Sequence, residues 1–274
     1  EIGNSVTYID KNAFSGCSGL TSVTWNIKNY QGFVRASESP FYGFNVTSFT
    51  FGNEVERVPA YICYGQEYLK EVTIGTNVIS IGSYAFKNCL ALTSVVWNAK
   101  NCQDFSSYMD GPFCPSGAKN ITLVLGTEVE HIPLNLCSYN NFSKVNYLGS
   151  VNKWVDLDFN SQGSNPTYYT KDLYINGELL TDVKISSADS IKKYAFYNCK
   201  SIKSLEIGKS VTSIGESAFS GCTGLVKVNY LGSVDRWAQI NFASLYANPT
   251  YNTNDLYIDD ELLTEVRISS VDNI

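Results

Sequence analysis

The sequence repeats itself, and this repetition constrains the fold more than any other feature. Residues 6–25 form the segment VTYIDKNAFSGCSGLTSVTW, and residues 211–230 keep the same residue types at the same spacing. Segments 78–97 and 188–207 fit the same template, and weaker copies begin at Val55 and Val129. Such self-similarity is typical of a solenoid, in which each repeat forms one coil.

The most regular part of each repeat is the pattern L-x-x-V-x-I, whose alternation of apolar and polar residues is typical of a short strand with one buried face. Ten such strands are predicted, with their middle residues at Val23, Phe49, Val72, Val95, Leu123, Val145, Val183, Leu205, Val228 and Val266. They recur about every 23 residues, within the range of about 20–29 residues for leucine-rich repeats.

One coil cannot close a hydrophobic core alone, so coils must stack and their strands must pair in parallel. We therefore predict a repeat solenoid of the leucine-rich-repeat type. It is expected to be a curved, right-handed stack of about ten coils, with a parallel sheet on the concave face, short helices and irregular turns on the convex side, and inserted hairpins.

Two kinds of insertion interrupt the basic repeat. Residues 145–191 match 228–274 at a constant offset, and residues 25–41 resemble 97–113. In the first kind, Ser150 or Ser233 is predicted to cap a short helix that holds a Trp and a Phe.

The same insertions are predicted to contain hairpins. Asn176-Gly177 predicts a tight two-residue turn, whereas Asp259-Asp260 in the second copy is a poorer turn. No linker rich in Pro, Ser or Gly divides the series, so we predict a single solenoid over residues 1–274. Because the chain begins and ends within a repeat, we expect it to be a fragment of a longer protein.

Composition excludes several classes of partner. With 44% hydrophobic and 17% charged residues, the chain is expected to fold. A net charge of −6 gives no basic stripe for phosphates, so no nucleic-acid partner is expected. No apolar run approaches the roughly 20 residues of a transmembrane helix, so no direct membrane insertion is expected, and we expect the fragment to be monomeric.

Six of the eight cysteines fall into repeat slots, and Cys102 and Cys114 lie outside them. These six are predicted to be buried, unpaired thiols that act as small hydrophobic side chains: Cys17, Cys89, Cys199 and Cys222 in one slot, and Cys63 and Cys137 in another. Cys102 and Cys114 lie in or beside the 97–113 insertion and are candidates for a disulfide bond. The sequence has neither a C-x-x-C motif nor a Cys/His cluster, and no nucleotide-binding motif, so no metal and no cofactor are expected.

No catalytic residues are predicted. His131 is the single histidine, and its place beside a core position favours a structural role at the edge of a coil. Asp156 and Asp158 could form a carboxylate pair for glycoside hydrolysis. The second copy has Gln239 and Asn241 at these positions, so a solvated helix face is the preferred interpretation and no enzymatic activity is expected.

The repeat V-T-x-I-x-x-x-A-F-x-x-C-x-x-L-x-x-V-x-I resembles the BspA-type, or Treponema-type, leucine-rich repeats. The match is nearly letter by letter at 6–25, 78–97, 190–207 and 211–230, and weaker copies extend it over essentially the whole chain. The resemblance implies a secreted or surface-attached bacterial protein that acts as an adhesin, with its signal and anchor outside this fragment. The family has no defined set of binding or catalytic residues that could be mapped onto this sequence.

Three hypotheses about function follow. The first is a non-enzymatic extracellular module that recognises a protein or glycoprotein, such as one of a host, through its concave strand face and insertions. The second is a structural spacer that presents another domain, and the third is a carbohydrate-binding or carbohydrate-active surface protein. The first hypothesis predicts ligand contacts at Ser22, Thr24, Glu71, Thr73, Ser94, Lys144, Asn146, Ser204, Glu206, Lys227 and Asn229.

Aromatic residues can separate recognition from the spacer function, because aromatics clustered on one face favour recognition and buried, scattered ones favour a spacer. Those that lie in insertions are Tyr30, Phe33, Tyr42, Phe44, Tyr108, Tyr168, Tyr169, Tyr246 and Tyr251.

Overall fold

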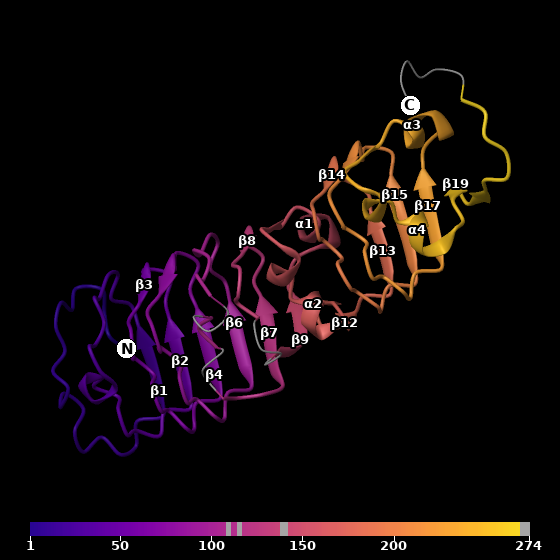
Figure 1. Ribbon diagram of the computed structural model, residues 1–274. Coiled ribbons are helices and arrows are strands. Elements are labelled where there is room, and N and C mark those ends of the chain that lie inside the picture. The colour runs from indigo at the N-terminus through magenta and orange to yellow at the C-terminus, as the bar shows by residue number, and fades with distance from the viewer. Residues whose placement is uncertain (108–110, 114–116, 138–141, 269–274) are drawn as a thin grey trace. The chain divides into compact units, whose positions relative to one another are not determined.

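The computed structural model describes residues 1–107, 111–113, 117–137 and 142–268. The chain divides into two compact units, unit 1 (Glu1–Asn146) and unit 2 (Tyr147–Ile274). Each unit is a β-solenoid of stacked coils (Figure 1). The single solenoid over residues 1–274 stays a prediction. Among the described residues, no helix is long and apolar enough to cross a membrane.

Unit 1 is built around a parallel sheet with one strand from each coil (Figure 1). Its strands, in sheet order, are β1 (Ser22–Trp25), β2 (Ser48–Phe51), β4 (Glu71–Ile74), β6 (Ser94–Trp97), β7 (Ile121–Leu125) and β9 (Phe142–Tyr147). Away from this sheet lie η1 (Ala36–Glu38), the parallel pair of β3 (Arg57–Val58) and β5 (Ser80–Ile81), and β8 (His131–Ile132).

The register of the unit 1 sheet aligns equivalent residues of successive repeats. Val23 pairs with Phe49, Phe49 with Val72, and Val72 with Val95. All four side chains are at most 6% exposed. The predicted strand pattern is therefore confirmed, and its apolar positions form continuous rows inside the solenoid.

Unit 2 repeats this plan. Its main sheet contains β13 (Asp182–Ile185), β15 (Ser204–Gly208), β17 (Lys227–Leu231), β19 (Tyr257–Ile258) and β20 (Glu261–Leu262). A second parallel sheet contains β14 (Ser190–Ile191), β16 (Ser213–Ile214) and β18 (Asn241–Phe242). The insertions add β10 (Asp158–Phe159), β11 (Tyr174–Ile175), β12 (Glu178–Leu179), α1 (Val151–Trp154), α2 (Thr167–Thr170), α3 (Val234–Ala238), α4 (Thr250–Thr253), η4 (Gln162–Ser164) and η5 (Leu245–Ala247).

The predicted helix caps are confirmed. Ser150 Oγ accepts a hydrogen bond from Lys153 N at 3.2 Å, and Ser233 Oγ accepts one from Arg236 N at 3.3 Å. Each hydroxyl satisfies a backbone donor that the first helical turn leaves without a partner. Phe159 lies in β10, after the helix rather than within it.

Both predicted hairpins also form. Asn176 and Gly177 have φ values of 51° and 88°, which the turn between β11 and β12 requires. The turn between β19 and β20 has the same left-handed geometry, although Asp259 and Asp260 occupy it with φ values of 46° and 68°. The poorer turn sequence therefore still closes a hairpin.

Several coils turn at two left-handed positions. One position precedes the Ala-Phe slot and holds Tyr61, Tyr84, Asn135, Tyr194 or Ser217, with φ between 52° and 64°. The other position lies next to a cysteine of the repeat. It directly precedes the cysteine at Gly16, Asn88, Asn198 and Gly221, and follows it by two residues at Gly65. Asn and Gly adopt this conformation readily, whereas a bulky tyrosine adopts it rarely.

The structure corrects two further predictions. Nine of the ten expected strands form, but the segment around Val266 is not a strand, and Val266 is 62% exposed. Its counterpart Val183 pairs with Leu205 of the next coil, whereas no described strand follows Val266 to pair with it. Cys17 is exposed rather than buried, because the first coil has a neighbouring coil on one side only in the structure.

The other five cysteines predicted to fill the core are buried and unpaired: Cys63, Cys89, Cys137, Cys199 and Cys222. Two of these thiols donate to the preceding coil, Cys89 to Cys63 O and Cys222 to Phe196 O, each at 3.1 Å. Burial raises the pKa of Cys89 to about 12 and that of Cys199 to about 11.

This arrangement predicts a sharp contrast in thiol reactivity. A raised pKa keeps the buried thiols protonated at neutral pH, and the thiolate is the reactive form. In the folded protein at pH 7, iodoacetamide should modify Cys17 promptly and leave Cys63, Cys89, Cys199 and Cys222 unmodified until denaturant is added. Peptide-resolved mass spectrometry measures both sets. Rapid alkylation of Cys89 in the folded chain would contradict the predicted burial.

Candidate functional site

The outward side chains of the unit 1 sheet form two rows, which we call the first strand face. One row contains Ser22, Ser48, Glu71, Ser94 and Thr122, and the other contains Thr24, Thr50, Thr73, Val96 and Val124. Parallel strands lie about 4.8 Å apart, so each row is about 19 Å long. Within the described part of the chain, none of these ten side chains forms a hydrogen bond or ion pair.

The chemistry of the first strand face is uniform. Glu71 is the single charged group in its two rows, and the other positions carry hydroxyl groups or the methyl groups of valine. These side chains are short, and Thr and Val are stiff at χ1, so a partner would order little of this surface on binding. The arrangement suits docking of a broad, flat surface better than enclosure of a small molecule.

The corresponding second strand face, on unit 2, is charged and paired internally. Its rows contain Asp182, Ser204 and Lys227, and Lys184, Glu206 and Asn229. Ser204 Oγ donates to Asp182 Oδ1 at 2.5 Å, and hydrogen bonds from Ser204 and Thr181 lower the pKa of Asp182.

The turn of the β19–β20 hairpin engages the end of this second strand face. Asp260 Oδ1 lies 2.8 Å from Lys227 Nζ and accepts a hydrogen bond from Asn229 Nδ2 at 3.2 Å. The hydrogen bond to Asp260 raises the pKa of Lys227. Asn229 is only 3% exposed, so it is not an open position for ligand contact.

The structure also extends the set of outward positions that the sequence suggested. Ser22, Thr24, Glu71, Thr73 and Ser94 all lie on the first strand face, as expected. Positions that the sequence interpretation missed are Ser48, Thr50, Val96, Thr122, Val124, Asp182 and Lys184. These positions can be identified in the sequence, because apolar and polar residues alternate around the buried residues Phe49, Val95, Leu123 and Val183. Lys144 and Asn146 lie in β9, half-buried.

A second candidate site lies on the coil turns of unit 1. Its aromatic side chains, which we call the tyrosine surface, are Tyr42, Tyr61, Tyr64, Tyr68 and Tyr84. Tyr42, Tyr68 and Tyr84 are 52%, 56% and 45% exposed. The ring centroids of Tyr61 and Tyr84 are 5.4 Å apart, and those of Tyr61 and Tyr64 are 5.9 Å apart.

Two shallow cavities open on the tyrosine surface and share Tyr42 and Tyr64. The first, of about 400 Å³, is also lined by Asn45, Glu67, Tyr68 and Asn88, among others. The second, of about 470 Å³, is also lined by Arg35, Tyr61, Tyr84 and Lys87, among others. Both are open depressions on the surface rather than enclosed pockets.

Buried polar side chains fix the insertion that carries Tyr42. Ser39 Oγ donates to Ile62 O at 2.8 Å, and Gln66 Nε2 donates to Phe41 O at 2.5 Å. Ser39 and Gln66 are 3% and 1% exposed. These hydrogen bonds therefore hold the insertion, and Tyr42 with it, against the coil turn that carries Tyr61 and Tyr64.

The aromatics of the insertions differ in exposure. Phe33 is buried and Tyr30 packs against Trp25, so both have structural roles. In unit 2, Tyr168 and Tyr169 contact each other and are half-buried. Tyr246 and Tyr251 are about half exposed and also pair with each other. Phe44 lines the first cavity, and Tyr108 lies outside the described residues.

Tyr61, Tyr64, Tyr68 and Tyr84 were missed as candidates because they lie on regular coil turns rather than in insertions. The repeat alignment contains a signal for two of them: Tyr61 and Tyr84 occupy the left-handed slot that holds Asn135 and Ser217 in other coils.

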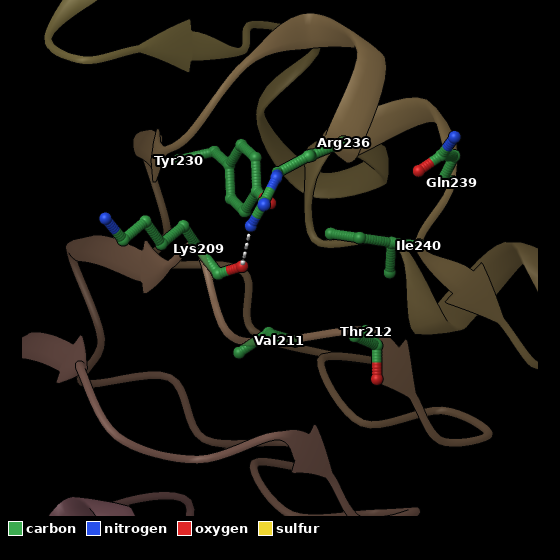
Figure 2. A pocket seen from close by; sticks show the side chains of 7 residues that line it. All are labelled: Lys209, Val211, Thr212, Tyr230, Arg236, Gln239 and Ile240. Carbon is green, nitrogen blue, oxygen red and sulfur yellow. Dashed lines mark hydrogen bonds between the residues drawn. The ribbon is translucent and has the colours of Figure 1, made fainter. Parts of the chain in front are cut away.

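Unit 2 has a cavity of about 380 Å³ beside α3, lined by Lys209, Val211, Thr212, Tyr230, Arg236, Gln239 and Ile240 (Figure 2). Arg236 Nη1 donates to Lys209 O at 3.5 Å, so the guanidinium extends from the helix toward the preceding coil. Burial raises the pKa of Tyr230, and the charge of Arg236 opposes that effect. The residues that line the cavity include Lys209 and Arg236 but no carboxylate or histidine.

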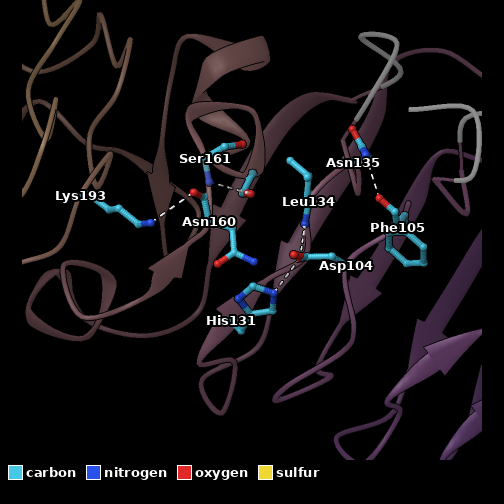
Figure 3. A network of polar contacts seen from close by, with 9 residues as sticks. Asp104, Phe105, His131, Leu134, Asn135, Asn160, Ser161 and Lys193 are labelled. Atoms are coloured by element: carbon cyan, nitrogen blue, oxygen red, sulfur yellow. Dashed lines mark hydrogen bonds and ion pairs between the residues drawn. The ribbon is translucent and has the colours of Figure 1, made fainter. Parts of the chain in front are cut away.

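His131 has a structural contact in unit 1. Asp104 Oδ1 lies 3.0 Å from His131 Nε2 and accepts a hydrogen bond from Leu134 N at 2.7 Å (Figure 3). Asn135 Nδ2 donates to Phe105 O at 2.8 Å. These contacts tie the second insertion to the following coil, and the His131 side chain is 15% exposed, less than expected for an edge residue.

The first insertion is tied down in a similar way. Lys28 and Asn29 both contact the carboxylate of Glu56, at 3.0 and 2.9 Å. In the second insertion, Lys100 and Asn101 contact Glu130 at 2.9 and 3.2 Å. The related insertions therefore share an ion pair as well as a sequence pattern.

The remaining candidate residues form no catalytic or metal site among the described residues. Asp156 and Asp158 are both exposed, but they do not lie on a helix face as expected, because Asp156 follows α1 and Asp158 is in β10. Within the described ranges, no group of three or more His, Cys, Asp or Glu residues could hold a metal ion. Cys102 is 1% exposed, but Cys114 lies outside the described residues, so the disulfide stays a prediction.

Comparisons with known proteins agree with the repeat pattern. The model of the BspA type leucine-rich repeat region matches residues 1–109, 34–163 and 170–272. No curated protein matches the chain.

Solved structures that resemble the chain include a leucine-rich cell surface protein from Faecalibacterium prausnitzii and a leucine-rich repeat protein from Eubacterium ventriosum. Each is 16% identical to this chain. The first has a TM-score of 0.28 and aligns over 85% of this chain and 71% of its own. The second has a TM-score of 0.30 and aligns over 78% of this chain and 66% of its own.

The anchoring of the first insertion can be tested with Gln66→Ala. This change leaves the buried Phe41 carbonyl without its donor, which should lower the free energy of unfolding by about 1–3 kcal/mol. Proteolysis within residues 34–44 should also become faster. Urea denaturation and limited proteolysis measure these effects, with the exposed neighbour variant Glu67→Ala as the control. Equal stability of the two variants would show that Gln66 does not hold the insertion.

Proposed function

Because the chain belongs to the BspA-type leucine-rich-repeat family, we propose that it is a non-enzymatic recognition module of a bacterial cell surface. In this proposal it acts like an adhesin, and its partner is a protein or glycoprotein of a host. The first strand face is the binding surface. The module works outside the cell, where such a partner is accessible.

One observation carries this proposal. The ten side chains of the first strand face lie in register on a rigid sheet, and none forms a hydrogen bond or ion pair within the described part of the chain. Their hydroxyl groups are therefore available to a partner. On the second strand face, by contrast, Asp182, Lys227 and Asn229 already bind groups of the same unit.

The strand geometry supports recognition by contact rather than catalysis. Repeat solenoids use the face formed by successive coils as an extended binding surface, because the spacing of side chains along it is fixed by strand pairing. No general acid, base or nucleophile is needed for such binding. The spacer function remains an alternative that binding experiments decide.

The experiment is binding of the chain to immobilised host matrix proteins and mucins, compared with the variant Thr50→Arg/Thr73→Arg. The two long cationic side chains would stand in the centre of the first strand face and block close approach. We expect saturable binding by the natural sequence and at least a tenfold loss in the variant, roughly 1.4 kcal/mol. Surface plasmon resonance measures the affinity.

The matched control is Thr127→Arg, which adds a cation at an exposed turn outside the face. It should bind like the natural sequence, and all three proteins should unfold at the same temperature. Absence of binding to every immobilised protein and mucin would favour the spacer. Equal loss in both the double variant and the control would remove the first strand face as the binding surface.

A further inference from the structure

We propose that the tyrosine surface of unit 1 is a second binding site, which accepts the sugar rings of an oligosaccharide. This proposal rests on the recognition function and deepens it, because it assigns a ligand class to a surface separate from the first strand face. A glycoprotein partner would then contact the module through both its protein and its glycan.

The tyrosine rings offer faces on which pyranose rings can stack. Tyr61 is inclined by 40° to Tyr64 and by 47° to Tyr84, so the rings form a bent platform and do not cover one another completely. An aromatic face carries partial negative charge and attracts the polarised C–H groups of a sugar ring. The phenol hydroxyls at the ring tips add hydrogen-bonding groups at the edge of the platform.

The polar residues around the first cavity match the hydroxyl groups of a sugar. Asn45, Glu67 and Asn88 line it beside Tyr64 and Tyr68. Amide groups donate and accept hydrogen bonds and a carboxylate accepts them, which suits the adjacent hydroxyls of a pyranose. All three side chains are exposed, and within the described chain none forms a side-chain hydrogen bond.

The second cavity is also lined by tyrosines and has a cationic edge. Lys87 Nζ lies 4.7 Å from the centre of the Tyr84 ring, and Arg35 pairs with Glu38 at 3.0 Å. Because the two cavities share Tyr42 and Tyr64, they can hold successive sugar units of one chain. Neither cavity is lined by Leu, Ile, Val or Met, the side chains that usually form pockets for apolar peptide anchors.

Backbone geometry indicates that these rings are not required by the fold. Tyr61 and Tyr84 have φ values of 59° and 58°, a conformation that costs a bulky residue energy. Asn135 and Ser217 make the equivalent turns with small polar side chains. The turn at these two positions therefore does not require a tyrosine, although Tyr194 occupies the same slot in unit 2.

The same comparison provides variants that preserve the turn. Tyr61→Asn/Tyr84→Asn removes both rings but keeps a residue type that another coil already uses in this slot. The control is Tyr194→Asn, at the equivalent slot of unit 2, where the ring packs against Tyr197 with centroids 6.0 Å apart. Circular dichroism and thermal unfolding verify that both proteins fold.

The probe is a set of defined soluble oligosaccharides, neutral and sialylated, screened on a glycan array and measured by isothermal titration calorimetry. We expect saturable binding of at least one oligosaccharide, a loss of about tenfold or more in the double variant, and a change of less than about twofold in the control. The Thr50→Arg/Thr73→Arg variant should bind the same sugar unchanged.

Three results would overturn the proposal: no binding of any oligosaccharide, equal binding by the natural sequence and the folded double variant, or loss of protein binding in the double variant without any sugar binding. The last would assign the tyrosine surface to a protein partner. If no sugar binds while matrix proteins still bind through the first strand face, this proposal fails and the recognition function stands. If a sugar binds the tyrosine surface while matrix proteins do not bind through the first strand face, the sugar site stands and the assignment of the first strand face is refuted.

Discussion

The in-register parallel pairing of successive coils is the constraint on which the rest of the structure depends. A strand such as β4 has Val72 and Ile74 fully buried, because neighbouring coils cover both of its edges and the turns cover its inner face. Burying such side chains contributes about 1.5–3 kcal/mol each, whereas an isolated coil would leave them partly in water. Stability therefore comes from the stacking of successive coils.

The same pairing positions the binding surfaces. Register that buries Val23, Phe49 and Val72 must place Thr24, Thr50 and Thr73 in a row on the opposite face of the sheet. Because side chains alternate strictly along a strand, a slip of one residue would exchange the two sets. The core thus fixes the spacing of the outer rows while leaving their chemistry free to vary, and the two strand faces differ accordingly.

The sequence alone was sufficient for the repeat architecture, the caps at Ser150 and Ser233, and both hairpins, since each depends on local patterns. It was insufficient for contacts that join distant residues. The ion pair of Lys227 with Asp260 and the contact of His131 with Asp104 follow from how insertions fold back on neighbouring coils. The alternation predicted that Asn229 points outward, but only the structure places Asp260 against it.

The tyrosine surface illustrates why a repeat alignment is more informative after the turns are known. When the repeats of this chain are aligned, the position of Tyr61 and Tyr84 varies from copy to copy. It precedes a buried pair, which is Ile-Cys after Tyr61 and Ala-Phe after Tyr84. In the structure the two tyrosines are left-handed corner residues stacked on adjacent coils, with Tyr61 N donating to Ser83 O at 3.2 Å. Coil stacking therefore converts two residues far apart in sequence into one aromatic surface, in the same way that it builds the strand faces.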